Sequence, residues 1–416
     1  MLDFSKEKIE FNDNYNSEEK VDILFAGDFC TRYNTEEMII EGESETILQP
    51  IKGNLKNKDL SVINLEGPLL NTNSPILKSG PNIKMDPKCI NFLKAGGFDI
   101  ANLANNHIGD HGTEGVLATI DTVENNNIRT VGAGENLKDS SKPISIIKNG
   151  IKISFLSFAE NEFGMAEDNK PGASPLNPLK NIEDIKNTSD NSDITIVLVH
   201  GGNEQNPIPS PRMKQTYRSF IDSGATAVIG THTHCPQGIE IYNESPIVYS
   251  LGNFLFDRNK TNNRADDSMW WKSYMVRVSF SKANAFALEV IPYNFGPAAE
   301  QINLLQGQDK IKFMDYLNFL SGVIKDKKEL NRFWRGWAAM NGPDWLNFIQ
   351  QIEYPFNKDD KEVNAKIPAA RNVLNCEAHN ELLTTFMNLV YRDEVESAAK
   401  YIPKINKLRK GQIPKS

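Results

Sequence analysis

The sequence contains no run of about 18 apolar residues, and its first 20 residues hold no apolar segment of the kind that a signal peptide needs. We therefore expect a cytoplasmic protein without a membrane anchor. Its four cysteines are scattered, which argues against a disulfide framework, and the absence of C-x-x-C excludes a structural zinc ribbon. It also lacks a G-x-S-x-G elbow, a Walker-type loop and a G-x-G-x-x-G fingerprint.

Basic residues are outnumbered by acidic ones. The chain has 46 Lys and Arg against 54 Asp and Glu, which gives a formal net charge of -8. Proteins that bind nucleic acids or anionic membranes usually carry a basic surface, so neither partner is expected. With 39% hydrophobic residues in 416, the chain can bury a full core, and its length predicts one large domain with an addition or two domains.

Residues 20–295 alternate short β-branched runs with helical patterns. The strand candidates are 21–28, 60–66, 98–104, 151–159, 193–200, 225–230 and 246–254. Helices are predicted between several of them, as at 86–96, where Asp86 can cap the helix and Pro87 suits its first position. This alternation is typical of a layered α/β core.

The pattern changes in residues 296–416, where helical periodicity replaces the strand signal. One apolar helical face is formed in 308–326 by Phe313, Leu317, Leu320 and Ile324. A tryptophan-rich stretch follows at Trp334, Trp337 and Trp345. These rings could contact a ligand, but tryptophans on a helix more often belong to a core or an interface. We therefore expect a helical C-terminal extension.

Polar side chains end or follow several of the predicted strands. They are Asp28, Glu66, Asn106, His107, His200, His232 and His234. In open α/β sheets ligands bind outside the carboxyl ends of the strands, so these groups are expected to converge there. Carboxylates, an amide oxygen and neutral imidazoles together suit a divalent ion such as Mn, Fe or Zn.

The sharpest local feature is 231-THTH-234, which carries His232 and His234. Taken alone, it fits two surface histidines in a polar loop, or a core histidine bonded to a backbone carbonyl, as well as it fits a metal site. The other polar strand ends favour the metal site.

Six motifs follow one another along the chain: 27-GD-28, 64-NLEGPL-69, 104-ANNHIGDHG-112, 200-HGGNE-204, 230-GTHTHCPQG-238 and 249-YSLGNFLFD-257. In this set the chain resembles the CapA/PgsA poly-γ-glutamate capsule biosynthesis family of the calcineurin-like metallophosphoesterase superfamily. The resemblance covers 20–295 and implies a four-layer α/β/β/α sandwich with a centre of two divalent metal ions. The resemblance does not extend to residues 296–416.

The resemblance implies two ligand sets that share Glu66. One metal would take Asp28, Glu66 and His234, and the other Glu66, Asn106, His200 and His232. Two such ions would lower the pKa of a bridging water, which is the chemistry of hydrolysis. The first motif departs from the phosphoesterase D-x-H pair because it reads 28-DFC-30. Cys30 is either a thiolate ligand or a small residue packed beneath the site, and packing is the commoner state of a free cysteine.

His107 stands beside Asn106 and is predicted to protonate the leaving group or stabilise developing charge, with Asp110 orienting its imidazole. The resemblance supports this assignment, since the superfamily uses a histidine here. The alternative for Asp110 is a carboxylate that caps the helix beginning near 113.

Three further residues are candidates for substrate contact: Glu204, Lys84 and Asn253. Glu204 could instead support a ligand histidine, since it follows His200 by four residues. Lys84 lies where the capsule family often has a basic residue, although a solvated lysine is the commoner explanation. Asn253 forms a Gly-Asn step with Gly252 and could serve a tight turn rather than a contact.

We therefore expect a metal-dependent hydrolase that acts on an anionic small molecule or polymer, through phosphoester or γ-glutamyl amide cleavage. The alternative is a non-catalytic component of an envelope-polymer assembly that binds an anionic chain. A third possibility, which rests on the helical extension alone, is a scaffold whose helices bind a partner.

Overall fold

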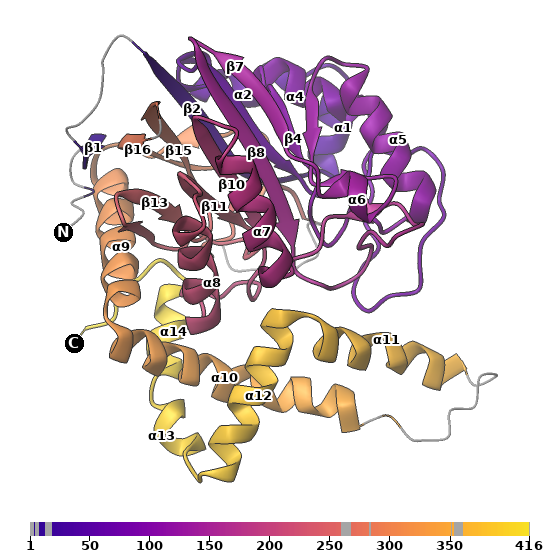
Figure 1. The fold of residues 1–416 in the computed structure, drawn as a ribbon. Coiled ribbons are helices and arrows are strands. Elements are labelled where there is room, and N and C mark those ends of the chain that lie inside the picture. The colour runs from indigo at the N-terminus through magenta and orange to yellow at the C-terminus, as the bar shows by residue number, and fades with distance from the viewer. Residues whose placement is uncertain are drawn as a thin grey trace.

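The computed structural model describes residues 4, 8–12, 19–258, 268–282, 284–350, 352 and 361–415, without the side chains of 361–365. Two β-sheets pack face to face, helices cover the outer face of each sheet, and further helices lie at one end of the sandwich (Figure 1). The predicted four-layer α/β/β/α sandwich is confirmed.

The larger sheet has nine strands within the described residues, in the order β1-β16-β15-β2-β3-β4-β5, with β14 beside β2 and β17 beside β16. Its strands are β1 (Lys8–Glu10), β2 (Lys20–Cys30), β3 (Leu60–Leu65), β4 (Ile100–Asn102), β5 (Arg129–Val131), β14 (Asn253–Phe256), β15 (Lys272–Ser281), β16 (Asn284–Asn294) and β17 (Asn303–Leu304). Strands β2 to β5 are parallel, so their carboxyl ends meet at one edge.

The smaller sheet has the order β12-β13-β11-β10-β8-β7. Its strands are β7 (Ile144–Lys148), β8 (Ile151–Ala159), β10 (Ile194–His200), β11 (Ala227–Thr231), β12 (Ile239–Tyr242) and β13 (Ser245–Val248). Strands β8, β10, β11 and β13 are parallel. A separate short pair is formed by β6 (Ala133–Gly134) and β9 (Gly172–Ala173).

Helices cover the outer faces of both sheets (Figure 1). Those associated with the larger sheet are α1 (Asn34–Ile40), α2 (Ser44–Leu48), α3 (Lys52–Lys56), α4 (Ile90–Gly96) and α5 (Gly112–Glu124), with 3-10 turns η1 (Gln49–Ile51) and η2 (Pro87–Cys89). The smaller sheet is covered by α7 (Pro178–Ser189) and α8 (Pro211–Asp222), and α6 (Leu137–Ser140) lies beside β6. The predicted cap of 86–96 forms, because the Asp86 side chain accepts a hydrogen bond from the backbone N–H of Lys88.

Side chains alternate along the buried strands. On β2, Ile23 and Phe25 pack between the sheets, whereas Leu24 and Ala26 pack against the outer helices. Successive side chains of a strand point to opposite faces, so a strand covered on both faces is apolar throughout. This is why the central strands read as continuous apolar runs.

The predicted strand over 246–254 is wrong as a single element. The chain forms β13 in the smaller sheet, crosses at 249–252, and enters the larger sheet as β14. The crossing needs glycine, because a Cβ on Gly27 would lie 1.8 Å from the carbonyl oxygen of Gly252, and Gly252 itself has a φ of +76°. The two sheets therefore meet closely beside the end of β2.

The C-terminal helices are α9 (Gly307–Lys325), α10 (Lys327–Gln350), α11 (Lys361–Asn375), α12 (Glu377–Tyr391), α13 (Val395–Ala399) and α14 (Ile402–Leu408). The apolar face predicted in 308–326 is buried: Phe313, Leu317 and Leu320 pack in the same core as the sandwich, and Ile324 packs in the apolar cluster on the outer face of the smaller sheet. Trp334 and Trp337 belong to that core too. In the part of the chain that the structure describes, no helix is both long and apolar enough to cross a lipid bilayer.

Candidate metal centre and pocket

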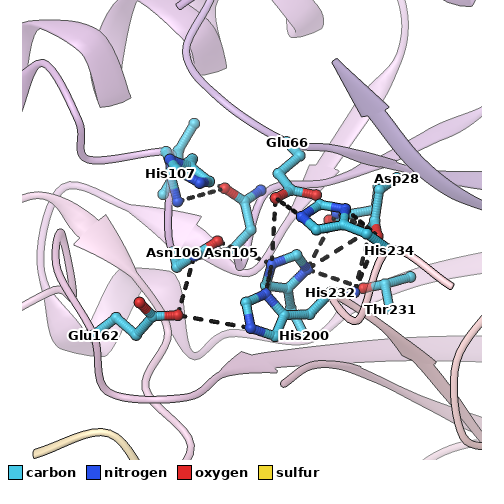
Figure 2. Close-up of polar contacts among 12 residues, drawn as sticks. Asp28, Glu66, Asn105, Asn106, His107, Glu162, His200, Thr231, His232 and His234 are labelled. Carbon is cyan, nitrogen blue, oxygen red and sulfur yellow. Dashed lines mark hydrogen bonds and ion pairs between the residues drawn. The ribbon is translucent and has the colours of Figure 1, made fainter. Parts of the chain in front are cut away.

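The predicted metal ligands converge where the two sheets meet (Figure 2). Asp28 lies near the end of β2, Glu66 directly follows β3, and His200 ends β10. The predicted ligands form two groups whose ligand atoms all lie within 4.8 Å of one another: Glu66, His200 and His232, and Asp28, Glu66 and His234. These groups share Glu66, as do the two ligand sets that the resemblance implies.

The two carboxylates of the centre are completely buried. Burial raises the pKa of Asp28 to about 7, against the lowering effect of a hydrogen bond from Asn64 Nδ2 at 2.7 Å. Burial also raises the pKa of Glu66 well above its ordinary value, and nearby Asp28 and Glu204 add to this effect. Two buried carboxylates side by side are costly without a compensating positive charge.

Glu66 shows most directly that a cation fits this centre. Neither of its carboxylate oxygens has a hydrogen-bond partner, although both are buried. Its Oε1 lies 3.5 Å from His234 Nε2 and 3.9 Å from His200 Nε2. Buried polar atoms are almost always satisfied, so an unpaired carboxylate surrounded by imidazoles indicates a divalent metal site.

The imidazoles of His200 and His234 are held in the neutral form that binds metals. Burial, together with the neighbouring histidines, lowers the pKa of His200 and of His234 well below the ordinary value. His200 Nε2 lies 3.0 Å from His232 Nδ1. His232 and His234 have φ angles of 93° and 53°, a conformation that costs energy for a residue with a side chain and is typical of functional sites.

Asn106 is oriented by a residue that the sequence did not indicate. Its Oδ1 lies 3.0 Å from His200 Nε2, and its Nδ2 donates to Glu162 Oε1 at 3.0 Å (Figure 2). The same Glu162 oxygen is 3.7 Å from His232 Nε2. Glu162 therefore turns the amide oxygen of Asn106 toward the metal centre, and no motif around it marked this role.

His107 and Asp110 are joined as the sequence predicts for an acid and its orienting group. His107 Nδ1 is 2.7 Å from Asp110 Oδ2, and Lys78 Nζ donates to Asp110 Oδ1 at 2.5 Å. Burial alone would raise the pKa of Asp110, but His107 and Lys78 outweigh it and hold this pKa below its ordinary value. Asp110 is not a helix cap, because α5 has His111 at its N-cap position and no side-chain cap hydrogen bond.

Lys78, rather than Lys84, is the lysine beside this group. Lys84 Nζ donates to the backbone oxygens of Leu70 and Asn71, and Lys84 does not line the pocket. Lys78 does line it and also lies 3.3 Å from His107 Nδ1. Sequence spacing could not separate the two lysines, since both lie in the loop that precedes η2.

Cys30 and Asn253 both lie behind the ligands. Cys30 is buried in the apolar cluster of the larger sheet and belongs to none of the ligand groups that the described residues form, which supports packing over ligation. Asn253 Oδ1 pairs with His234 Nδ1 at 2.8 Å, and Asn253 is completely buried. Its hydrogen bond leaves His234 Nε2 directed at Glu66, so Asn253 positions a ligand instead of facing the pocket.

A pocket of about 620 Å³ opens over the centre, and the sandwich and the C-terminal helices both line it. The sandwich contributes Arg32, Lys78, Asn106, His107, His234 and Arg258. The C-terminal residues that line it are Trp337, Asn341, Trp345, Asn372, His379 and Arg409. Glu204 lies on the pocket wall as an exposed residue. The helical extension therefore forms part of the pocket.

The family described as "Bacterial capsule synthesis protein PGA_cap" matches residues 22–258. The chain belongs to this family. "Capsule biosynthesis protein CapA" of Bacillus anthracis is 31% identical over 285 residues, which cover 66% of this chain and 68% of that protein. "PGA biosynthesis protein CapA" of Bacillus subtilis (strain 168) is 30% identical over 286 residues, which cover 68% of this chain and 73% of that protein.

Solved structures show more distant similarity. A hypothetical protein from Thermus thermophilus has a TM-score of 0.43 at 17% identity, covering 66% of this chain and 99% of that one. A 5'-nucleotidase from Candida albicans has a TM-score of 0.37 at 13% identity, covering 77% of this chain and 60% of that one. Similarity at this level transfers no substrate.

Proposed function

We propose that this protein is a metal-dependent hydrolase that cleaves a phosphoester or a γ-glutamyl amide of an anionic substrate during capsule or poly-γ-glutamate biosynthesis. The names of the two Bacillus relatives support the pathway. The arrangement of the buried ligands and of the His107 group supports the chemistry.

The observation that carries the proposal is the unpaired carboxylate of Glu66 between three histidines and Asp28. Asp28, Glu66 and His234 would hold one divalent ion, and Glu66, Asn106, His200 and His232 the other. When bound, such ions supply Lewis acidity and a water of lowered pKa. Mn, Fe and Zn all suit this mixture of oxygen and nitrogen donors.

His107 is the residue that would transfer a proton. Asp110 occupies its Nδ1, so Nε2 is the nitrogen left to hold a proton toward the pocket that His107 lines. Lys78 compensates the charge of Asp110 and keeps it ionised. A fixed partner on Nδ1 orients the imidazole, which is what a general acid requires.

Basic side chains support an anionic substrate. Four of them line the pocket: Arg32, Lys78, Arg258 and Arg409. The guanidinium of Arg258 lies 4.0 Å from the centre of the Trp270 ring, which fixes its position at the pocket wall. Acidic residues also line the pocket, so the basic groups would select where the anion lies rather than create a uniformly positive surface.

The test is metal content and turnover of the full chain. We expect at least two equivalents of metal in the wild-type protein, with hydrolysis of a generic phosphodiester or of a γ-glutamyl peptide after addition of Mn²⁺. His232→Ala should lose metal and turnover together. Metal without turnover on either substrate would contradict the hydrolase and favour a component that binds an anionic chain.

A further inference from the structure

A second cluster of metal-ligating groups lies where the C-terminal helices meet the sandwich. Glu162, Cys376 and His379 have ligand atoms that all lie within 4.8 Å of one another. Glu162 follows β8, Cys376 lies between α11 and α12, and His379 is in the first turn of α12. Both Glu162 and His379 line the pocket.

The cluster contains a buried group without a partner. His379 is 8% exposed, and its Nδ1 has no hydrogen-bond partner. Its ring packs on Trp345, with ring centres 4.1 Å apart, so the imidazole is held in place by apolar contact. A buried ring nitrogen without a partner, on a residue whose neighbours offer a thiol and a carboxylate, is unusual in a protein that binds nothing there.

The Glu162 carboxylate is neutralised only in part by its hydrogen bonds. The donors are the uncharged amides of Asn106, at 3.0 Å, and Asn372, at 3.2 Å. The neighbouring acidic group formed by Glu160, Cys376 and Glu377 differs, because Arg212 pairs with Glu160 and Asn161 donates twice to Glu377. Cys376 belongs to both groups, and its thiol donates to Glu160 Oε2 at 3.7 Å, so the Glu160 group is explained without a cation. In the Glu162 group, His379 Nδ1 stays without a partner.

We propose that Glu162, Cys376 and His379 bind a further divalent cation of the Zn²⁺ type in the wall of the pocket, separate from the two ligand sets that contain Glu66. A carboxylate, a thiolate and an imidazole are a preferred ligand set for Zn²⁺ and Co²⁺, and three protein ligands leave a fourth position for water or a pocket ligand. On binding, the Cys376 S–H bond breaks, a sulfur–metal bond forms, and the proton leaves to solvent.

Such an ion would join the two parts of the molecule. Glu162 also bonds Asn106 and approaches His232, so the position of α12 would be linked to the geometry of the main centre through one carboxylate. The proposal does not depend on hydrolysis, because it concerns ion binding by residues outside both main ligand sets.

The test is titration of the metal-free, reduced full chain with Co²⁺. We expect an intense near-ultraviolet thiolate-to-cobalt band. Cys376→Ser should abolish it, whereas Cys30→Ser, which changes the buried cysteine beside the main centre, should retain it. Retention in Cys376→Ser, loss in Cys30→Ser or absence of the band in the wild-type protein would overturn the proposal.

A second variant separates this site from the main centre. In His234→Ala, which removes a ligand of the main centre, the thiolate band should persist. Adding Glu162→Gln to that variant should weaken the Co²⁺ binding that the thiolate band reports by about tenfold or more, while the circular dichroism spectrum stays unchanged. Unchanged Co²⁺ affinity in the double variant would contradict the proposal even if Cys376→Ser failed to fold.

Discussion

The β sandwich and the C-terminal helices reach the same pocket, but they hold their side chains differently. The sandwich places Asp28 and His200 within hydrogen-bonded strands and Glu66 directly after one. The helices present Trp345 and His379, which are held largely by packing against each other and the core. Hydrogen-bonded strands define positions closely, whereas packed faces tolerate changes of shape. We therefore expect the sandwich to determine the chemistry and the helices to determine the fit of the substrate.

Replacing Glu66 should have the largest effect on the sandwich side of this comparison. Glu66→Gln keeps the shape but removes the charge shared by both ligand groups. We expect loss of bound metal and turnover that exceeds the roughly 10- to 100-fold cost of losing an outer partner of a ligand. Elemental analysis and phosphodiester hydrolysis measure both. Full metal content in Glu66→Gln would disprove the assignment.

Replacing His107, the proposed general acid, should lower turnover without changing metal binding. His107→Gln is expected to lower kcat by about 10²- to 10⁴-fold while the metal content is unchanged, because His107 belongs to neither ligand group. Asp110→Asn should lower kcat less and shift the pH profile, since it keeps the imidazole but changes the partner of Nδ1 and removes the carboxylate that pairs with Lys78. Equal kcat in wild type and His107→Gln would assign proton transfer elsewhere.

The buried Asp28 predicts how the stability of the metal-free protein depends on pH. Its pKa is about 7 in the folded protein against an ordinary value of 3.8, so the folded state holds a proton that the unfolded state has released between these values. The contribution of Asp28 to the free energy of unfolding should therefore be largest below the lower value and fall, by on the order of a few kcal/mol, as the pH rises through about 7.

Urea unfolding on either side of neutral pH measures this effect. Asp28→Asn is the matched control, because it has the same size and no titrating group, and its stability should vary less with pH. Added Mn²⁺ should reverse the trend, since metal binds the deprotonated carboxylate. A wild-type stability that does not fall relative to that of Asp28→Asn as the pH rises, in the absence of metal, would contradict the prediction.

Glu162 contacts both the sandwich and the C-terminal helices, so replacing it tests whether it positions a ligand of the main centre. Glu162→Gln should weaken metal binding at the main centre by about 10- to 100-fold, because Asn106 loses the partner that orients its amide. Glu167→Gln is the control, as Glu167 lies on the same loop but pairs with Lys170. Metal titrations that match in the two variants would show that Glu162 has no positioning role.

Replacing Trp345 should have the smallest effect on activity, and it tests whether the C-terminal helices determine the fit of the substrate. Trp345→Phe reduces the pocket wall without changing the ligands, so we expect KM to rise about threefold to tenfold with kcat nearly unchanged. Tyr391→Phe, at an exposed position of α12, should leave both constants unchanged. A fall in kcat for Trp345→Phe at unchanged KM would contradict the view that the helices determine only the fit of the substrate.

Much of the sandwich could be predicted because its signals are local. Apolar runs that end in Asp28, Glu66 and His200 indicate buried strands with polar ends, and parallel strands bring such ends to one edge. The split of 246–254 into β13 and β14 could not be predicted, because it depends on which sheet accepts each half.

The supporting residues were harder to predict. Lys78 and Glu162 carry no motif, and each is important only because distant chain segments lie beside it. Cys30 and Asn253 lie in motifs that suit a functional site. That both are buried behind the predicted ligands could be learned only from the packing of the larger sheet.

The sequence by itself determined the layered class of the fold and the ligand-bearing strand ends, because alternation, apolar runs and motif order are properties of neighbouring residues. Only the tertiary structure decided that the C-terminal helices line the pocket and that Glu162 meets Cys376 and His379. Those contacts join residues more than 200 positions apart. No local pattern specifies such a contact, because it depends on how whole elements pack.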